Sequence, residues 1–299
     1  MSRDETTLKG EAGQITGLLR AQLQRHLQEQ GDCPLAAGVT FHRRHATNTP
    51  ENCFYRPIFG LTLQGAKRTV IGKDEYRYGA GHCIVTGVDM PSINYITDAS
   101  PEKPYMVVSL HLDFHLISQL VAQVPALPAK ASGHSLVCPT DPEVLKAFLR
   151  LVSLEEKPEQ IPVLAPMFIR EIHFRLLTGA QGGLLRTICT VGSQSNRIAK
   201  AITWIRNNFK EPLEVEGLAG SVYMSVPTFR KHFKLVTSMS ATEYHKRLRL
   251  YEAQRLMLEE NSDAAKACYA VGYENPHQFN REYKRLFGDP PQRNVSQLR

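Results

Sequence analysis

One short pattern occurs twice near the C-terminus of this 299-residue chain, and it constrains the fold more than any other feature of the sequence. The segment QFNREYKRLFGDPP covers 278–291, and TFRKHFKLVTSMSA covers 228–241, 50 residues earlier. Phe279 and Tyr283 lie four positions apart in the later copy, and the earlier copy has two phenylalanines at the matching positions. Residues four apart share one face of a helix. The repeat therefore predicts two similar helices, each with an aromatic face toward a core and a basic face toward solvent.

A shorter helix and a tight turn precede each copy. The first copy follows EVEGLAGSVY and a turn at Met224 and Ser225, and the second follows SDAAKACYA and the turn VGYEN. Gly272 supplies the positive φ that the second turn requires. Two short helices joined by a tight turn form a helix-turn-helix, whose second helix can enter the major groove of DNA. The chain thus predicts two such units.

The segment between the copies, ATEYHKRLRLYEAQRLMLEE, has Tyr244, Leu248, Tyr251 and Leu258 near helical spacing. Roughly twenty helical residues span about 30 Å, and successive major-groove faces on one side of B-DNA lie about 34 Å apart. A stiff connecting helix can therefore hold two recognition helices in successive major grooves. The sequence predicts that one chain carries what a helix-turn-helix dimer assembles from two.

The buried aromatic faces determine which residues of the two helices point outward. Arginine favours guanine edges, and asparagine or glutamine favours adenine edges. The predicted base-reading residues are Pro227, Thr228, Arg230, Lys231, His277, Gln278, Asn280 and Arg281. Phosphate contacts supply affinity without sequence choice. The residues predicted to make them are Lys234, Arg247, Arg249, Lys284 and Arg285.

Positive charge concentrates in the same region. Residues 193–299 contain 17 Lys and Arg against 11 Asp and Glu, whereas residues 1–192 contain 19 against 18. Most of the formal net charge of +7 therefore lies in the last third of the chain. This asymmetry favours a polyanionic partner for that part alone.

The region from 35 to 112 consists of short apolar runs separated by turn residues. FGLTLQGAKRTVIGKDEYRYGAGHCIVTG is typical of strands joined by turns at Gly65, Gly72 and Gly79 to Gly81. Several short strands at this spacing predict an antiparallel barrel or sandwich. Helices are predicted over 15–27, 114–124, 141–156 and 163–179, the third with Asp141 as its N-cap. We therefore expect an α+β chain with an N-terminal helix in 1–30, a β-rich domain with helices in 31–192 and an all-α domain in 193–299.

The C-terminal third closely resembles the AraC/XylS family of bacterial transcription regulators. The pattern continues through LAGSVYMSVPTFRKHFK, YHKRLRLYEAQRLML, VGYENPHQFNREYKRLFG and DPP, from Ile198 to Arg293. The first copy departs from the family pattern at Ser238, where glycine is usual, and at Ala241, where proline is usual. The resemblance implies a DNA-binding domain of two helix-turn-helix units joined by a long helix.

The segments LQGAKRTVIGKDEYRYGAGHCIVTGVDMPS and ASPEKPYMVVSLHLD resemble the sensing domain of one AraC-type subfamily. This resemblance implies a cupin-like β-barrel that binds a small-molecule effector, followed by helices that support association. The candidate pocket residues on the predicted strands are Phe59, Lys67, Tyr76, His82 and Met106. The expected partners are double-stranded DNA at a promoter or operator, the effector, RNA polymerase and a second copy of the chain in a homodimer.

Two alternatives to an effector-controlled regulator remain open at this stage. One is a metal-dependent cupin enzyme with a DNA-binding domain, and the other is an architectural DNA-binding protein without an effector. Metal cupins need an H-x-H pair, which the sequence lacks, and His111 and His115 lack the glutamate of a zincin motif. We therefore expect no enzyme activity, no metal and no cofactor.

The six cysteines are scattered, with no C-x-x-C pair, which favours reduced thiols over a zinc ribbon or a disulfide framework. Cys53 and Cys83 are predicted to lie in or near the pocket strands, where an electrophile would act. No apolar run reaches the about 18 residues of a membrane span, and the polar N-terminal segment lacks a signal peptide's apolar run. We expect a cytoplasmic protein.

Overall fold

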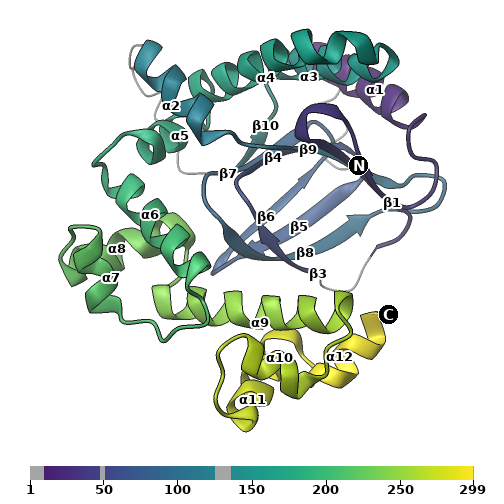
Figure 1. Ribbon diagram of the computed structural model, residues 1–299. Coiled ribbons are helices and arrows are strands. Elements are labelled where there is room, and N and C mark those ends of the chain that lie inside the picture. The colour runs from purple at the N-terminus through teal and green to yellow at the C-terminus, as the bar shows by residue number, and fades with distance from the viewer. Residues whose placement is uncertain (1–9, 48–50, 125–135, 299) are drawn as a thin grey trace.

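A computed structural model describes residues 10–47, 51–124 and 136–298 of the chain, with the side chains of residues 51 and 52 excepted. Figure 1 shows two parts, a β-rich part with helices along one side and an all-helical part that follows it. The expected α+β architecture is confirmed.

The strands form two antiparallel sheets. The larger has the order β1(Gly31–Pro34), β2(Val39–Arg44), β9(Tyr105–His111), β4(Ile58–Gln64), β7(His82–Thr86) and β10(Val137–Pro139). The smaller has the order β3(Glu51–Tyr55), β8(Met90–Asp98), β5(Ala66–Ile71) and β6(Asp74–Gly79). Between β4 and β5 the chain passes from the larger sheet to the smaller at Gly65, whose φ is +77°. A Cβ at this position would lie 2.4 Å from the Asp98 carbonyl oxygen. Glycine is required there because any side chain would collide with backbone.

The two sheets do not close into a barrel within the described residues. The sequence predicted either a barrel or a sandwich, and the barrel implied by the resemblance is here an open sandwich. The reason lies in the edges: β10 has three residues, and neither β3 nor β6 pairs with a strand of the larger sheet. The sandwich is therefore open toward the loops that join its sheets.

Helices cover the outer face of the larger sheet (Figure 1). They are α1(Glu11–Leu23), α2(Phe114–Gln123), α3(Pro142–Ser153), α4(Ile161–Thr178) and α5(Gly182–Cys189), with short turns η2(Ala36–Gly38), η3(Leu154–Glu156) and η4(Pro158–Gln160). The predicted cap is confirmed, since the Asp141 carboxylate accepts a hydrogen bond from the Glu143 amide at 2.8 Å. Phe59 of β4 is fully buried and stacks on Phe148 of α3, with ring centroids 5.2 Å apart. The apolar core of this part thus lies between the larger sheet and the helices.

The C-terminal part consists of helices, in the order α6(Gln194–Asn207), α7(Val215–Ser221), α8(Val226–Thr237), α9(Ala241–Glu259), α10(Ala264–Ala270), α11(Pro276–Phe287) and α12(Pro291–Leu298). The pairs α7–α8 and α10–α11 are the two predicted helix-turn-helix units, and α9 is the predicted connecting helix. The division at 192 stays a prediction, although α6 begins close to it, with the Ser193 hydroxyl accepting from the Asn196 amide at 3.0 Å.

The two parts share an apolar core rather than meeting through a linker. Phe54 of β3 contacts the rings of Tyr244 and Tyr251 on α9, with centroid distances of 5.7 and 6.1 Å. The Tyr244 hydroxyl donates to the Asp89 carbonyl at 3.1 Å, and the Tyr251 hydroxyl donates to the Ser92 carbonyl at 3.0 Å. Helix α9 therefore lies against the smaller sheet, as Figure 1 also shows.

Replacing Phe54 with alanine should loosen α9 from the smaller sheet. Each aromatic pair contributes about 0.5–1.5 kcal/mol, so losing two should lower the free energy of unfolding by about 1–3 kcal/mol. Hydrogen exchange should rise along α9 before the rest of the chain unfolds. The matched control is Phe168→Ala, which removes a half-buried phenylalanine from α4. Equal exchange of α9 in both variants would contradict the docking.

Two glycines with nearly equal φ values allow a test of the second helix-turn-helix. Gly272 has a φ of +86°, and a Cβ there would lie 2.1 Å from the Lys210 carbonyl oxygen. Gly288 has a φ of +87° and open space around the same position. Gly288→Ala should lower the free energy of unfolding by about 1–2 kcal/mol, the cost of placing a side chain in the left-handed region. Gly272→Ala should lower it clearly more. Urea unfolding measures the free energy of unfolding of both variants. Equal losses would show that backbone strain alone sets the cost and that the contact with the Lys210 carbonyl oxygen adds nothing.

Candidate nucleic-acid interface and effector cavity

Helix α8 presents a basic face because its aromatic residues are buried. Phe229 and Phe233 are both 0% exposed, with ring centroids 5.4 Å apart. The predicted base-reading residues Pro227, Arg230 and Lys231 are exposed, and Thr228 is half-buried. The phosphate candidate Lys234 is exposed as well. The four-residue spacing of the two rings fixes which side of α8 faces outward.

Helix α11 repeats this arrangement. Phe279 and Tyr283 are buried, and the predicted residues on the opposite face are all exposed: His277, Gln278, Asn280, Arg281, Lys284 and Arg285. The Asn275 side chain caps the helix by accepting from the backbone amides of residues 277 and 278, at 2.9 and 3.3 Å. This cap lies where a recognition helix presents its first residues to base edges.

Two of the predicted phosphate contacts have other partners. The Arg249 guanidinium donates to the carbonyl oxygens of residues 209, 210 and 211, at 2.6, 2.7 and 3.0 Å. Arg247 forms an ion pair with Glu243 on the same helix, at 2.8 Å, and its side chain is 17% exposed. Because the sequence shows only that both arginines are basic, it could not show that Arg249 fastens the loop after α6 to α9.

The same two tyrosines that dock α9 also contact both recognition helices. The Tyr244 ring lies 5.6 Å from that of Phe233 on α8, and the Tyr251 ring lies 5.6 Å from that of Phe287 at the end of α11. Phe54 of β3 contacts both tyrosines. An aromatic path thus leads from one strand of the β-rich part to each helix-turn-helix.

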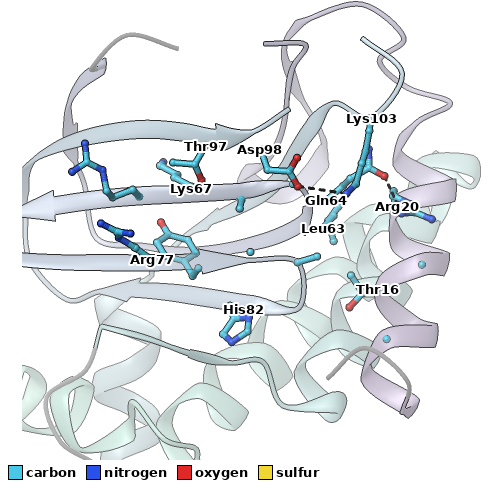
Figure 2. A pocket seen from close by; sticks show the side chains of 18 residues that line it. Thr16, Arg20, Leu63, Gln64, Lys67, Arg77, His82, Thr97, Asp98 and Lys103 are labelled. Atoms are coloured by element: carbon cyan, nitrogen blue, oxygen red, sulfur yellow. Dashed lines mark hydrogen bonds and ion pairs between the residues drawn. The ribbon is translucent and has the colours of Figure 1, made fainter. Parts of the chain in front are cut away.

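A cavity of about 950 Å³ opens between the edge of the sandwich and α1. Figure 2 shows side chains from α1, from both sheets and from the loop before β9 around it. Its lining includes Arg20, Leu63, Gln64, Lys67, Tyr78, His82, Asp98 and Lys103. The Arg20 guanidinium donates to the Gln64 amide oxygen at 2.9 Å, and Lys103 pairs with Asp98 at 3.4 Å.

The sequence-predicted pocket residues divide between this cavity and other places. Lys67 and His82 line the cavity. Phe59 and Met106 are 0% exposed and belong to the core beneath the helices, and they do not line this cavity. Tyr76 packs near the junction with the helical part and does not line the cavity. Strand register, which alternation cannot supply, decides which face each residue occupies.

Polar groups fill the inner face of the smaller sheet. The Lys67 ammonium donates to the Tyr55 hydroxyl at 2.7 Å, and that hydroxyl donates to the Asn94 side-chain oxygen at 2.8 Å. The Thr69 hydroxyl bonds both Asn94 and Tyr78, at 2.9 and 3.1 Å. Burial raises the pKa of Tyr55 and of Tyr78 well above the ordinary value, so both stay protonated and can donate. The sandwich therefore has an apolar helix side and a polar interior.

Two buried polar atoms on the larger sheet lack a hydrogen-bond partner among the described residues. They are Oγ1 of Thr62 and Nδ1 of His82. Buried polar atoms are nearly always hydrogen-bonded, and of these two residues His82 lines the cavity, where its Nδ1 suits a contact with a bound molecule. Arg20 and Gln64 are cavity residues that the sequence did not predict, although the alternation of β4 after Phe59 places Gln64 on the face opposite the apolar residues.

The described residues contain no group of three His, Cys, Asp or Glu side chains that could hold a metal ion. Within the same residues, no helix combines the length and apolar character needed to cross a bilayer.

Two family models match the chain on the two parts of the fold. An AraC-type transcriptional regulator N-terminus matches residues 36–184, and a helix-turn-helix domain matches residues 218–295. Among curated proteins, the transcriptional activator RhaS of Pectobacterium atrosepticum is 26% identical over 100 residues, 33% of this chain and 36% of RhaS. RhaS of Yersinia pestis is 28% identical over 105 residues, 35% of this chain and 38% of RhaS. The chain thus spans little more than a third of the length of these relatives.

Solved structures of ToxT from Vibrio cholerae share the fold over most of the chain. An apo ToxT variant gives a TM-score of 0.56 at 9% identity, covering 89% of this chain and all of that one. ToxT bound to an unsaturated fatty acid gives 0.55 at 9% identity, covering 86% and 94%. With a regulator N-terminus matched on the β-rich part and a helix-turn-helix matched on the helical part, the chain belongs to the AraC family of transcriptional regulators.

Proposed function

We propose that this protein is a sequence-specific transcription regulator that reads DNA with α8 and α11 in successive major grooves. The observation that carries the proposal is the duplicated exposed basic face of α8 and α11, with both helices fixed to α9 by buried aromatic residues. The proposal gives the chain no catalytic activity and places it in the cytoplasm, where bacterial DNA lies. RNA polymerase and a second copy of the chain remain proposed partners.

The proposed base-reading residues are those exposed on the first turns of the two helices, Pro227, Arg230, Lys231, His277, Gln278, Asn280 and Arg281, with Thr228 beside them. Lys234, Lys284 and Arg285 are proposed to contact phosphates. Arg247 and Arg249 leave this set because they have partners inside the protein.

We further propose an anionic small-molecule effector for the cavity beside α1. Arg20, Lys67 and Lys103 line it, against the single carboxylate of Asp98. The unpartnered Nδ1 of His82 and the hydroxyl of Tyr78, both on residues that line the cavity, supply further hydrogen bonds. The ToxT structure with a bound fatty acid supports a carboxylate ligand in this fold by analogy.

A bound effector can influence α9 through β8. The side chain of Asn94 on β8 belongs to the polar interior, while the Ser92 carbonyl on the same strand accepts from Tyr251 of α9. If β8 and α9 adopt two arrangements, a ligand that binds one of them more tightly shifts the equilibrium toward it. The size of the shift is set by the difference between the two affinities. Since α9 holds both recognition helices, their spacing on DNA would change together.

DNA binding by the purified chain tests the function directly. Fragments from upstream of its own gene and its neighbours should bind far more tightly than random competitor, with a steep salt dependence.

Arg281→Ala should weaken specific binding by about 1–3 kcal/mol and relax the choice of one base pair. Lys284→Ala should weaken binding to every sequence and reduce the salt slope by about 1.

The matched control for these variants is Lys157→Ala, which removes an exposed lysine between η3 and η4 of the β-rich part. It should leave both affinity and salt slope unchanged. If Arg281→Ala weakened binding to specific and to random DNA equally, Arg281 would not read a base. Weak, sequence-blind binding by the wild type, with and without candidate effectors, would overturn the function.

Thermal unfolding in the presence of small carboxylates tests the anionic effector. A ligand at about 100 times its Kd stabilises the folded state by about 2.7 kcal/mol, so the correct carboxylate should raise Tm and its neutral alcohol analogue should not. Arg20→Gln should remove most of that shift. Arg25→Gln removes the same charge from a residue outside the cavity, paired with Glu156, and should keep it. A neutral analogue that binds as tightly would contradict an anionic ligand.

A further inference from the structure

Two cysteines that are far apart in the sequence lie opposite each other in the larger sheet. Cys83 of β7 and Cys138 of β10 are direct partners in the antiparallel register, and their Sγ atoms are 3.8 Å apart. Cys83 is 2% exposed, whereas Cys138 is half-buried. Cys53, which was predicted with Cys83 to lie in or near the pocket strands, belongs to β3 of the other sheet.

The backbone geometry of this pair suits a disulfide. Two backbone hydrogen bonds join the strands, each two residues away from the cysteine pair. The Val85 amide donates to the carbonyl of residue 136 at 2.8 Å, and the Thr140 amide donates to the Gly81 carbonyl at 2.9 Å. The cysteines therefore occupy a hydrogen-bonded position, where Cα atoms are about 5.5 Å apart. Disulfides form across Cα distances of about 4.4–6.8 Å, with an S–S bond of about 2.05 Å. Rotation of the two side chains can close the remaining gap between the sulfurs.

The surroundings give the two thiols different reactivities. The Cys83 thiol and the Gln181 amide, both of which donate to its sulfur, lower the pKa of Cys138 to about 7. The hydrogen bond to Cys138 and burial raise the pKa of Cys83 well above its ordinary value. Cys138 therefore ionises more readily than Cys83 and is the more accessible of the two. Thiolates, not thiols, are the attacking species in cysteine chemistry.

We propose that Cys83 and Cys138 form a reversible dithiol–disulfide pair that reacts with hydroperoxides. The Cys138 thiolate attacks one peroxide oxygen and the O–O bond breaks. Cys138 becomes a sulfenic acid, and the alkoxide or hydroxide that leaves takes a proton from solvent to give an alcohol or water. The Cys83 sulfur then attacks the Cys138 sulfur. The S–S bond forms, and the hydroxide that leaves takes the Cys83 proton as water. Two thiols are oxidised by two electrons, and one hydroperoxide is reduced.

The pair lies beside the junction with the DNA-binding part. Gln181, which donates to both sulfurs, is the residue immediately before α5. Ile188 of α5 shares a buried cluster with Ile198 and Ile202 of α6 and with Leu136, which precedes β10. Oxidation of Cys138 would remove the negative charge from the sulfur to which the Gln181 amide donates. This change would occur at the start of α5, the helix on which α6 packs.

The test uses the full chain, first reduced and then treated with hydrogen peroxide. Digestion without reductant, followed by mass spectrometry, should reveal the Cys83 peptide joined to the Cys138 peptide, and a thiol reductant should separate them. In Cys83→Ser, the linked peptide should disappear and Cys138 should accumulate as a sulfenic acid that dimedone traps. Cys33→Ser removes a half-buried cysteine of β1 and should leave the linked peptide unchanged.

Oxidation of wild-type Cys138 to sulfinic acid, or its pairing with another chain, while Cys83 stays a free thiol would overturn the proposal. So would wild-type protein in which Cys83 and Cys138 both remain free thiols after the peroxide treatment. The wild-type measurement decides the question even if a variant fails to fold, and it does not depend on the proposed DNA binding.

Discussion

The contact of Phe54 with Tyr244 and Tyr251 is the interaction on which the arrangement of this protein depends. One phenylalanine of β3 contacts both tyrosines of α9, and each tyrosine contacts the buried aromatic side of a different recognition helix. Both tyrosine hydroxyls also donate to backbone carbonyls at the start of β8 or just before it. Because packed aromatic side chains do not deform continuously, a shift of the smaller sheet must be transmitted to both helix-turn-helix units or break these contacts.

The open sandwich separates two kinds of interior. The apolar residues of β4 and β9 face the helices, where burial of apolar surface stabilises the fold. The inner face of the smaller sheet contains hydroxyls, amides and the Lys67 ammonium in a hydrogen-bonded network. A buried polar network is costly unless its members are satisfied, and His82, whose Nδ1 lacks a partner among the described residues, lines the cavity. The fold thus combines an apolar scaffold on the larger sheet with a polar face on the smaller sheet.

The two helix-turn-helix units are alike in their aromatic faces and different in their ends. Helix α8 ends at Ser238, whose φ is +60°, and the Ser238 hydroxyl donates to the Asp74 carboxylate at 2.5 Å. Helix α11 ends at Gly288, with open space around it. Serine in the left-handed region costs more than glycine would, and the bond to Asp74 at the β5–β6 turn offsets part of this cost. The first unit is thereby fastened to the β-rich part at the end of its recognition helix.

The sequence by itself determined the helical part, because its information is local: aromatic residues four apart, caps, a turn glycine and a repeat specify α7 to α11 and their outward faces. It also determined that the region from 35 to 112 consists of strands. The tertiary structure alone decided the rest. Register placed Phe59 and Met106 under the helices and Lys67 and His82 at the cavity, since a shift of one residue exchanges the faces of a strand. Only the fold brought Arg20 to the cavity, Arg249 to the loop after α6 and Cys138 to Cys83, because contacts between residues far apart in the chain leave no periodic signal in it.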